Sequence, residues 1–213
     1  LDAQAFLRRQ EDAAVSLGFS ASLDRLSGTL RVLSANREQG FELLRLALTQ
    51  PRFDPEMVEQ RRAQTISQLN QAEQQPRSVA GRTLMKALFA GHPYAADPEG
   101  TREDLKTLTP DLLKRRAAVL LLRSGLLVSA VGDIAEAELA NLLDRAFGDL
   151  VIGTVPPLPP EWTPPTAPRT IVVERAVPQS TAVMALPGID RDDPAWYAAV
   201  IMNHVLGGGG QQS

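Results

Sequence analysis

Apolar residues recur at helical spacing through most of the first 150 positions of the chain. In residues 2–17, Phe6, Ala13 and Leu17 fall on one face of a helix, and Gly18 follows as a C-terminal signal. Asp54 and Pro55 mark another start, because aspartate caps a helix and proline suits its first position. Similar patterns predict helices at 36–49, 54–74, 77–89, 109–119, 135–147 and 193–207.

Shorter apolar runs between these helices indicate strands. Residues 19–33 alternate apolar and polar side chains on either side of a turn at 24–28, which predicts two paired strands. Residues 125–131 form an almost wholly apolar run, typical of a buried strand. The segments 170–175 and 180–186 are predicted to be strands as well.

Proline divides the chain near its last quarter. Residues 155–168 contain so many prolines that neither a helix nor a central strand can form, because proline lacks the N–H donor. We interpret residues 153–168 as an extended, stiff linker. Two strands and a helix are too few to close a domain. Residues 169–213 are therefore predicted to be the start of a second domain, after a first part that spans 1–152.

Composition excludes several classes of function. The 213 residues carry a net charge of −3, whereas a nucleic-acid-binding surface normally has a basic excess. The chain has no cysteine, which excludes disulfides, thiolate metal sites and a cysteine nucleophile. No apolar run is long enough to span a membrane. The N-terminal residues lack the apolar core of a signal peptide, which is typical of a fragment that begins inside a helix.

Few residues of the chain are candidates for metal binding or catalysis. Zinc hydrolases usually hold the metal with three protein ligands, but His92 and His204 are the only histidines and lie far apart in the sequence. Their surroundings favour backbone hydrogen bonding for His92 and a helix-surface or packing role for His204. No serine lies in a GxSxG elbow. The glycine-rich run 206–213 follows a helix and lacks the Lys-Ser/Thr of a phosphate loop, so it is interpreted as a turn.

Several short stretches, in this order and spacing, resemble the M16 (pitrilysin-like, inverzincin) metallopeptidase family. They are PRFDPEMVEQRR at 51–62, HPY at 92–94 with Gly100, LVSAVGD at 127–133, Phe147-Gly148, and GIDRDDP at 188–194 leading to LGGG at 206–209. The resemblance implies an α+β fold, with helices packed on one face of a mostly antiparallel sheet in a repeated domain. The proline-rich linker falls where that family joins its two homologous domains.

The resemblance also implies that this chain lacks the zinc-binding apparatus. In active members an HxxEH helix supplies two histidines and the catalytic glutamate, and the chain contains no such motif. The third ligand and a supporting glutamate lie seven residues apart on a later helix, and the matching positions here are Gln68 and Arg61. A neutral amide is a poor zinc ligand, and a guanidinium repels the metal.

Aligning the chain with the family one residue earlier or later does not supply the missing zinc ligand. A shift of one residue brings Ser67 or Leu69 to the ligand position, and neither supplies a carboxylate. The glutamates Glu59 and Glu73 would require larger shifts. We therefore expect no catalytic or metal-binding residue in this chain, and its substrate-binding residues stay unassigned, because an Arg/Tyr pair that follows the glycine-rich turn in the family is not reached.

The function implied is that of a non-catalytic M16 chain. Such a chain pairs with an active, HxxEH-bearing subunit or domain as a bacterial heterodimer, closes a peptide-degrading chamber, and leaves the zinc to its partner. Two alternatives remain: a truncated piece of an active zinc metalloendopeptidase, or an unrelated α+β binding protein. The family's exported members favour the periplasm, and the cytoplasm stays open.

Overall fold

The N-terminal part of the chain is a helix, a hairpin and a second helix. In the computed structural model, which describes residues 1–208, α1 spans Ala3–Asp12, β1 Ser16–Ala21, β2 Leu26–Arg31 and α2 Arg37–Thr49. The strands pair antiparallel, with Ser16 opposite Arg31 and Ala21 opposite Leu26. A single 3-10 turn, η1 (Ser34–Asn36), leads from the hairpin into α2.

Helix α1 is shorter than the sequence predicted. It ends at Asp12, where Ala14 adopts a left-handed φ of 50° and the N–H of Val15 donates to the carbonyl of Gln10 at 2.7 Å. The chain reverses here because Ala13 and Val15 are both buried in the hydrophobic core. Residue 17 therefore lies in β1 and not in a helix, which corrects the predicted helix at 2–17.

The predicted hairpin at 19–33 is present, with its turn shifted toward the N-terminus. The N–H of Ser22 donates to the carbonyl of Arg25 at 2.8 Å, so the turn lies at 22–25 and not at 24–28. Gly28 belongs to β2 and lies opposite Phe19. A side chain at this position would start 3.0 Å from Cε1 of Phe19, so glycine allows the ring to cover the neighbouring strand.

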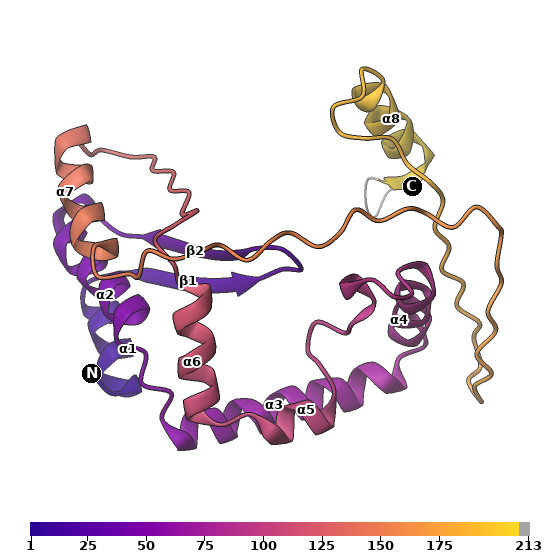
Figure 1. The fold of residues 1–213 in the computed structure, drawn as a ribbon, viewed down its shortest axis with the longest axis horizontal. Coiled ribbons are helices and arrows are strands. Elements are labelled where there is room, and N and C mark those ends of the chain that lie inside the picture. The colour runs from indigo at the N-terminus through magenta and orange to yellow at the C-terminus, as the bar shows by residue number, and fades with distance from the viewer. Residues whose placement is uncertain (209–213) are drawn as a thin grey trace.

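The core forms where α2 meets the hairpin and α7 (Glu136–Phe147), which lie together at one end of the molecule (Figure 1). Leu142 is only 1% exposed, and Ala146 packs with Leu44 and Leu48 of α2. Salt bridges surround this contact, among them Arg37 Nε to Glu138 Oε1 at 3.0 Å. Segments about 100 residues apart in sequence therefore form one packed unit.

Four further helices extend from this unit: α3 (Pro55–Gln74), α4 (Pro76–Leu88), α5 (Arg102–Thr107) and α6 (Pro110–Leu120). The helix predictions for 54–74, 77–89, 109–119, 36–49 and 135–147 are thus correct to within about two residues, the usual uncertainty of helix ends. The sequence reasoning missed α5. Its start is a capping box in which Thr101 and Asp104 satisfy each other's backbone N–H groups.

The predicted strands at 125–131, 170–175 and 180–186 are wrong for this structure, because all three segments lack regular secondary structure. A strand is stable only when a neighbour satisfies its backbone groups, and within residues 1–208 the hairpin β1–β2 is the only sheet. The apolar side chains of these segments are left exposed, and Leu127 is 92% accessible to solvent. The fold class is α+β, with a smaller sheet than the sequence suggested.

The last helix is also shorter than predicted. Helix α8 covers Trp196–Asn203, not 193–207, and a π-helical turn, η3 (His204–Gly208), follows it. Gly207 has a φ of 119°, which supports the interpretation of a glycine turn there. Positions 209–213 of the glycine-rich run lie outside the described residues. None of the described helices combines the length and apolar character that crossing a bilayer requires.

Candidate functional site

Helix α3 carries both positions that the sequence singled out. It is a continuous helix of 20 residues, so the seven-residue interval between Arg61 and Gln68 places them two turns apart on one side. Both side chains are exposed. The Nη1 of Arg61 donates to Oε1 of Gln64 at 3.1 Å, one turn further along the helix. Arginine and two neutral amides therefore occupy this side of α3.

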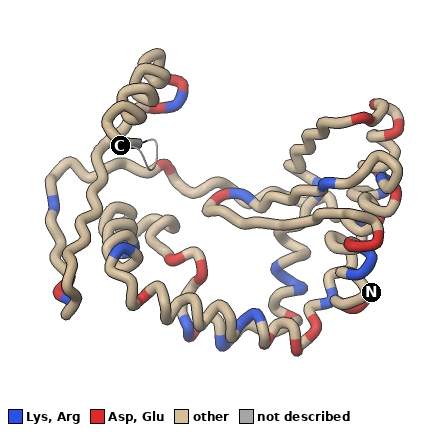
Figure 2. The backbone as a smooth tube through the Cα atoms, turned by 180° about the vertical axis from the view of Figure 1, so that it is seen from behind, with Lys and Arg blue, Asp and Glu red and all other residues tan. Residues whose placement is uncertain are grey.

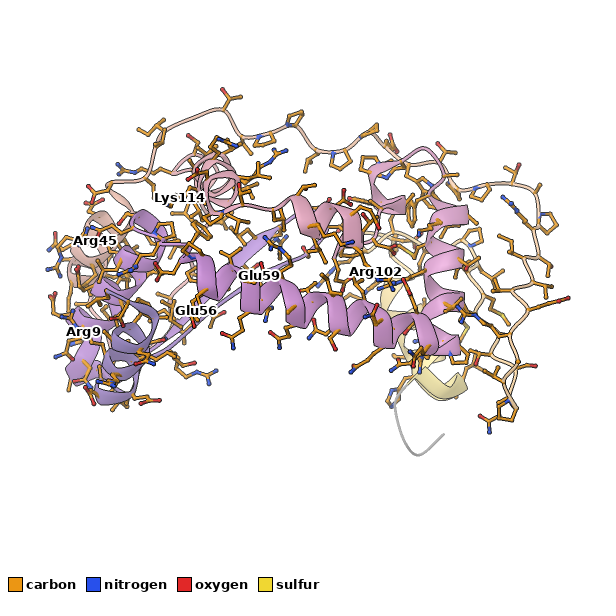
Figure 3. The ribbon with its side chains drawn as sticks, turned by 90° about the horizontal axis from the view of Figure 1, so that it is seen from below. Arg9, Arg45, Glu56, Glu59, Arg102 and Lys114 are labelled. Carbon is orange, nitrogen blue, oxygen red and sulfur yellow. The ribbon has the colours of Figure 1, made fainter. Side chains whose placement is uncertain are left out.

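The carboxylates of α3 that lie nearest to these positions are engaged by arginines. Glu59 forms an ion pair with Arg62, one turn away on the same helix. Glu73 forms one with Arg102 at the start of α5. Figure 3 shows Glu59 on the first half of α3 and Arg102 beside its second half. These glutamates serve as partners for cations of the protein itself.

Arginine side chains also tie α3 to the segments that follow it. Arg102 donates through Nε and Nη2 to Oδ1 of Asn70, at 2.9 and 2.7 Å. Arg62 reaches across to donate to the carbonyl of Leu108, between α5 and α6. Charges of both signs are interspersed along α3, as Figure 2 shows. This pattern is typical of a solvated face with structural ion pairs.

The donor set of α3 does not fit a catalytic zinc ion. Zinc needs carboxylate, imidazole or thiolate ligands, whereas Arg61 offers a cation and Gln68 a neutral amide. Across residues 1–208, no three His, Cys, Asp or Glu side chains come together as a metal-binding group. That Gln68 and Arg61 correspond to the zinc-ligand and supporting positions of active M16 enzymes stays a prediction.

His92 and His204 occupy unrelated surroundings. His92 precedes the 3-10 turn η2 (Pro93–Ala95), and its Nδ1 accepts the N–H of Tyr94 at 3.2 Å. This matches the prediction of a backbone-bonding role. His204 is exposed at the end of α8, so the predicted alternative of a helix-surface residue describes it better than packing does.

An aromatic cluster beyond α4 is the feature that sequence reasoning missed. The rings of Phe89, His92 and Tyr94 lie within 6 Å of one another, with centroid distances of 5.9, 5.5 and 4.5 Å. Trp162 of the proline-rich segment joins them, 4.6 Å from the ring of Phe89. The only signal in the sequence was a tryptophan among prolines, which says nothing about its partner.

One titrating group in this cluster is perturbed. The hydroxyl of Tyr94 donates to Oδ1 of Asp24 at 2.6 Å, in the hairpin turn. This hydrogen bond raises the pKa of Tyr94 above its ordinary value, and partial desolvation and the charge of Asp24 act in the same direction. The cluster is thus linked to the β1–β2 hairpin as well as to α4.

The sequence and the fold of this chain match those of a known protein family. Residues 107–213 match the family described as the peptidase M16 inactive domain. The fold also matches the crystal structure of a peptidase M16 inactive domain from Pseudomonas fluorescens, with a TM-score of 0.76 and 23% identity over 99% of this chain and 51% of that one. A crystal structure described as a protease from Helicobacter pylori matches with a TM-score of 0.65 and 17% identity, covering 78% of this chain and 40% of that one.

Curated relatives point the same way. The non-peptidase homolog YmxG of Helicobacter pylori is 29% identical over 153 residues, which is 72% of this chain and 35% of that protein. An uncharacterized zinc protease of Streptomyces coelicolor is 22% identical over 91% of this chain and 46% of its own length. The chain therefore spans less than half the length of these relatives.

The class that the fold defines is an α+β protein of the M16 type, in which a helical body packs on an antiparallel hairpin. Within that class, the chain belongs to the peptidase M16 inactive domain family. The predicted family is thereby confirmed, and the alternative of an unrelated α+β binding protein is wrong.

Proposed function

We propose that this chain is part of a non-catalytic M16 protein that pairs with an active, HxxEH-bearing subunit and helps to enclose peptide substrates. The observation that carries the proposal is the side of α3 formed by Arg61 and Gln68, in a chain whose family is described as an inactive domain. An arginine at that place opposes a cation electrostatically, so zinc and the reacting water would belong to the partner.

The proposal includes a division of the chain into parts of two domains. Residues 1–152 would form the C-terminal part of one M16-like domain, 153–168 a linker, and 169–213 the start of the next. The name of the Helicobacter relative, a non-peptidase homolog, supports a role without catalysis. The exposed apolar residues after position 153 support a need for further protein surface, since such side chains are normally covered.

The experiment is affinity purification of the full-length protein from its native cells, with identification of co-purifying proteins and zinc analysis of each component. The expected result is one stoichiometric partner that carries an HxxEH motif and all of the zinc. Peptide hydrolysis should be found only in fractions that contain the partner. It should be lost when the glutamate of the partner's motif is replaced.

The second candidate, a piece of an active zinc endopeptidase, makes the opposite prediction. The name of the Streptomyces relative, a zinc protease, keeps this candidate open. Under it, the full-length protein would purify alone with about one zinc per chain, and replacement of Gln68 or Arg61 would alter zinc content. That result would overturn the pairing proposal.

A further inference from the structure

The proline-rich segment is shielded from solvent at one defined place. Between residues 154 and 195, all described side chains are exposed except those of Pro159 and Trp162. Leu158, four residues before the tryptophan, is 80% exposed. Trp162 is half-buried, whereas Leu158 is exposed. Hydrophobicity alone therefore does not explain why Trp162 contacts the rest of the protein.

Specific hydrogen bonds fix this contact. The Nε1–H of Trp162 donates to the carbonyl of Leu88 at 3.1 Å. Leu88 is the last residue of α4, and the final carbonyls of a helix have no partner within the helix. The indole therefore satisfies an acceptor that would otherwise need water, while its ring packs on Phe89.

His92 supplies the second hydrogen bond. Because its Nδ1 accepts the N–H of Tyr94, the hydrogen of the neutral ring lies on Nε2. That Nε2–H donates to the carbonyl of Pro160 at 2.9 Å. An extended proline-rich chain makes no internal hydrogen bonds, so this carbonyl is available as an acceptor.

The chain is also held just before the prolines. The N–H of Arg123 donates to the carbonyl of Val151 at 2.9 Å, and the N–H of Gly153 donates to Oγ of Ser124 at 3.1 Å. Only residues 154–159 separate these bonds from the carbonyl of Pro160, which His92 holds. Proline limits the conformations of such a stretch, which lowers the entropy lost on docking.

We propose that Phe89, His92 and Tyr94, together called the aromatic socket, are an intramolecular docking site for the proline-rich segment, with Trp162 as its anchor. Aromatic surfaces are also known to bind extended proline-rich peptides, because such a peptide is already ordered. The docking sets the direction in which the chain leaves residues 1–152, and Tyr94 braces the socket against Asp24 of the hairpin turn. This inference does not depend on a zinc-bearing partner.

Fluorescence of Trp162 tests the docking in the full chain. The chain has two tryptophans, so Trp196→Phe leaves Trp162 as the single reporter. In that background its emission should be blue-shifted and partly protected from acrylamide. Phe89→Ala should shift the emission to the red and raise the quenching constant toward that of the denatured chain, whereas Leu158→Ala, which removes an exposed leucine from the same segment, should change neither.

Proteolysis gives an independent measurement. A glutamate-specific protease cleaves after Glu161, between the two docked residues Pro160 and Trp162, and mass spectrometry identifies that cut. Cleavage there requires undocking, so Phe89→Ala should accelerate it by about tenfold, since the rate follows the population of the open form. Leu158→Ala should be cleaved at the rate of the unaltered chain.

A third variant separates docking from folding. Trp162→Phe keeps a ring but removes the donor to Leu88, and it should raise the cleavage rate by about fivefold, the factor expected for one hydrogen bond. Circular dichroism should show unchanged helix content. The proposal is overturned if Trp162→Phe is cleaved at the unaltered rate, or if Phe89→Ala accelerates cleavage only together with a loss of helical signal.

Discussion

On α3, the residues that face solvent differ from the residue that is buried and stabilises the fold. Arg61 and Gln68 are exposed, whereas Leu69, the next residue, is only 4% exposed. One step along a helix turns a side chain by about 100°, so neighbouring positions can have opposite roles. The residues that would decide metal chemistry are thus independent of those that hold the helix in place.

Replacement of Arg61 or Gln68 by alanine should therefore change the free energy of unfolding by no more than about 0.5 kcal/mol. Leu69→Ala should lower it by about 2–5 kcal/mol, since it empties a buried site. Urea unfolding followed by circular dichroism measures both. In the complex that we propose with an active subunit, the two surface variants should retain zinc content and hydrolysis, and a loss of either would contradict a non-catalytic α3.

The hydrogen bond of Tyr94 predicts how the stability of the fold depends on pH. Its pKa is raised in the folded protein, so the bond to Asp24 stabilises the fold fully below the ordinary pKa of tyrosine, and this contribution disappears as pH rises through the raised value. Tyrosinate absorbance in a Tyr197→Phe variant isolates Tyr94. Asp24→Asn should lower the midpoint, because the negative charge next to the hydroxyl is removed. An unchanged midpoint would mean that the bond is absent in solution.

At the scale of elements, helix starts are determined locally. The start of α5 depends on Thr101 and Asp104, which cap each other's backbone N–H groups. The hydrogen bonds from the side chain and backbone N–H of Thr101 lower the pKa of Asp104. A six-residue helix has too few internal bonds to form without such a cap.

Thr101→Ala should destabilise the protein by about 1 kcal/mol, the usual cost of losing an N-cap. The contribution of Asp104 is present above the ordinary aspartate pKa and is lost as pH falls through the lowered value. Unfolding at neutral and acidic pH should therefore show a smaller acid dependence for Asp104→Asn than for the unaltered chain. Glu103→Gln, at the neighbouring position, serves as the control and should keep the original dependence.

At the scale of the whole molecule, contacts between distant segments hold the body together. Helix α7 packs on α2, where Ala146 lies against Leu44 and Leu48, and Arg145 pairs with Glu38 across the contact. Removing these contacts would separate α7 from the N-terminal unit, since the segment between α6 and α7 has no regular structure.

Leu142→Ala should lower the free energy of unfolding by about 2–5 kcal/mol, as expected for a leucine that is almost completely buried. Leu127→Ala, in the neighbouring exposed segment, should stay within about 0.5 kcal/mol. Thermal unfolding of the two variants compares them directly. If Leu127→Ala were the more destabilising, the segment at 125–131 would be packed in solution.

The sequence by itself determined most of the helices, the hairpin and the unsuitability of Arg61 and Gln68 for zinc, because caps, periodicity and side-chain charge are properties of neighbouring residues. Tertiary structure alone decided the rest. Residues 125–131 have a strand pattern but form no strand, since pairing requires a second strand at the right place. Trp162 docks on a helix end 74 residues away in sequence, where a free carbonyl and an aromatic ring coincide only after folding.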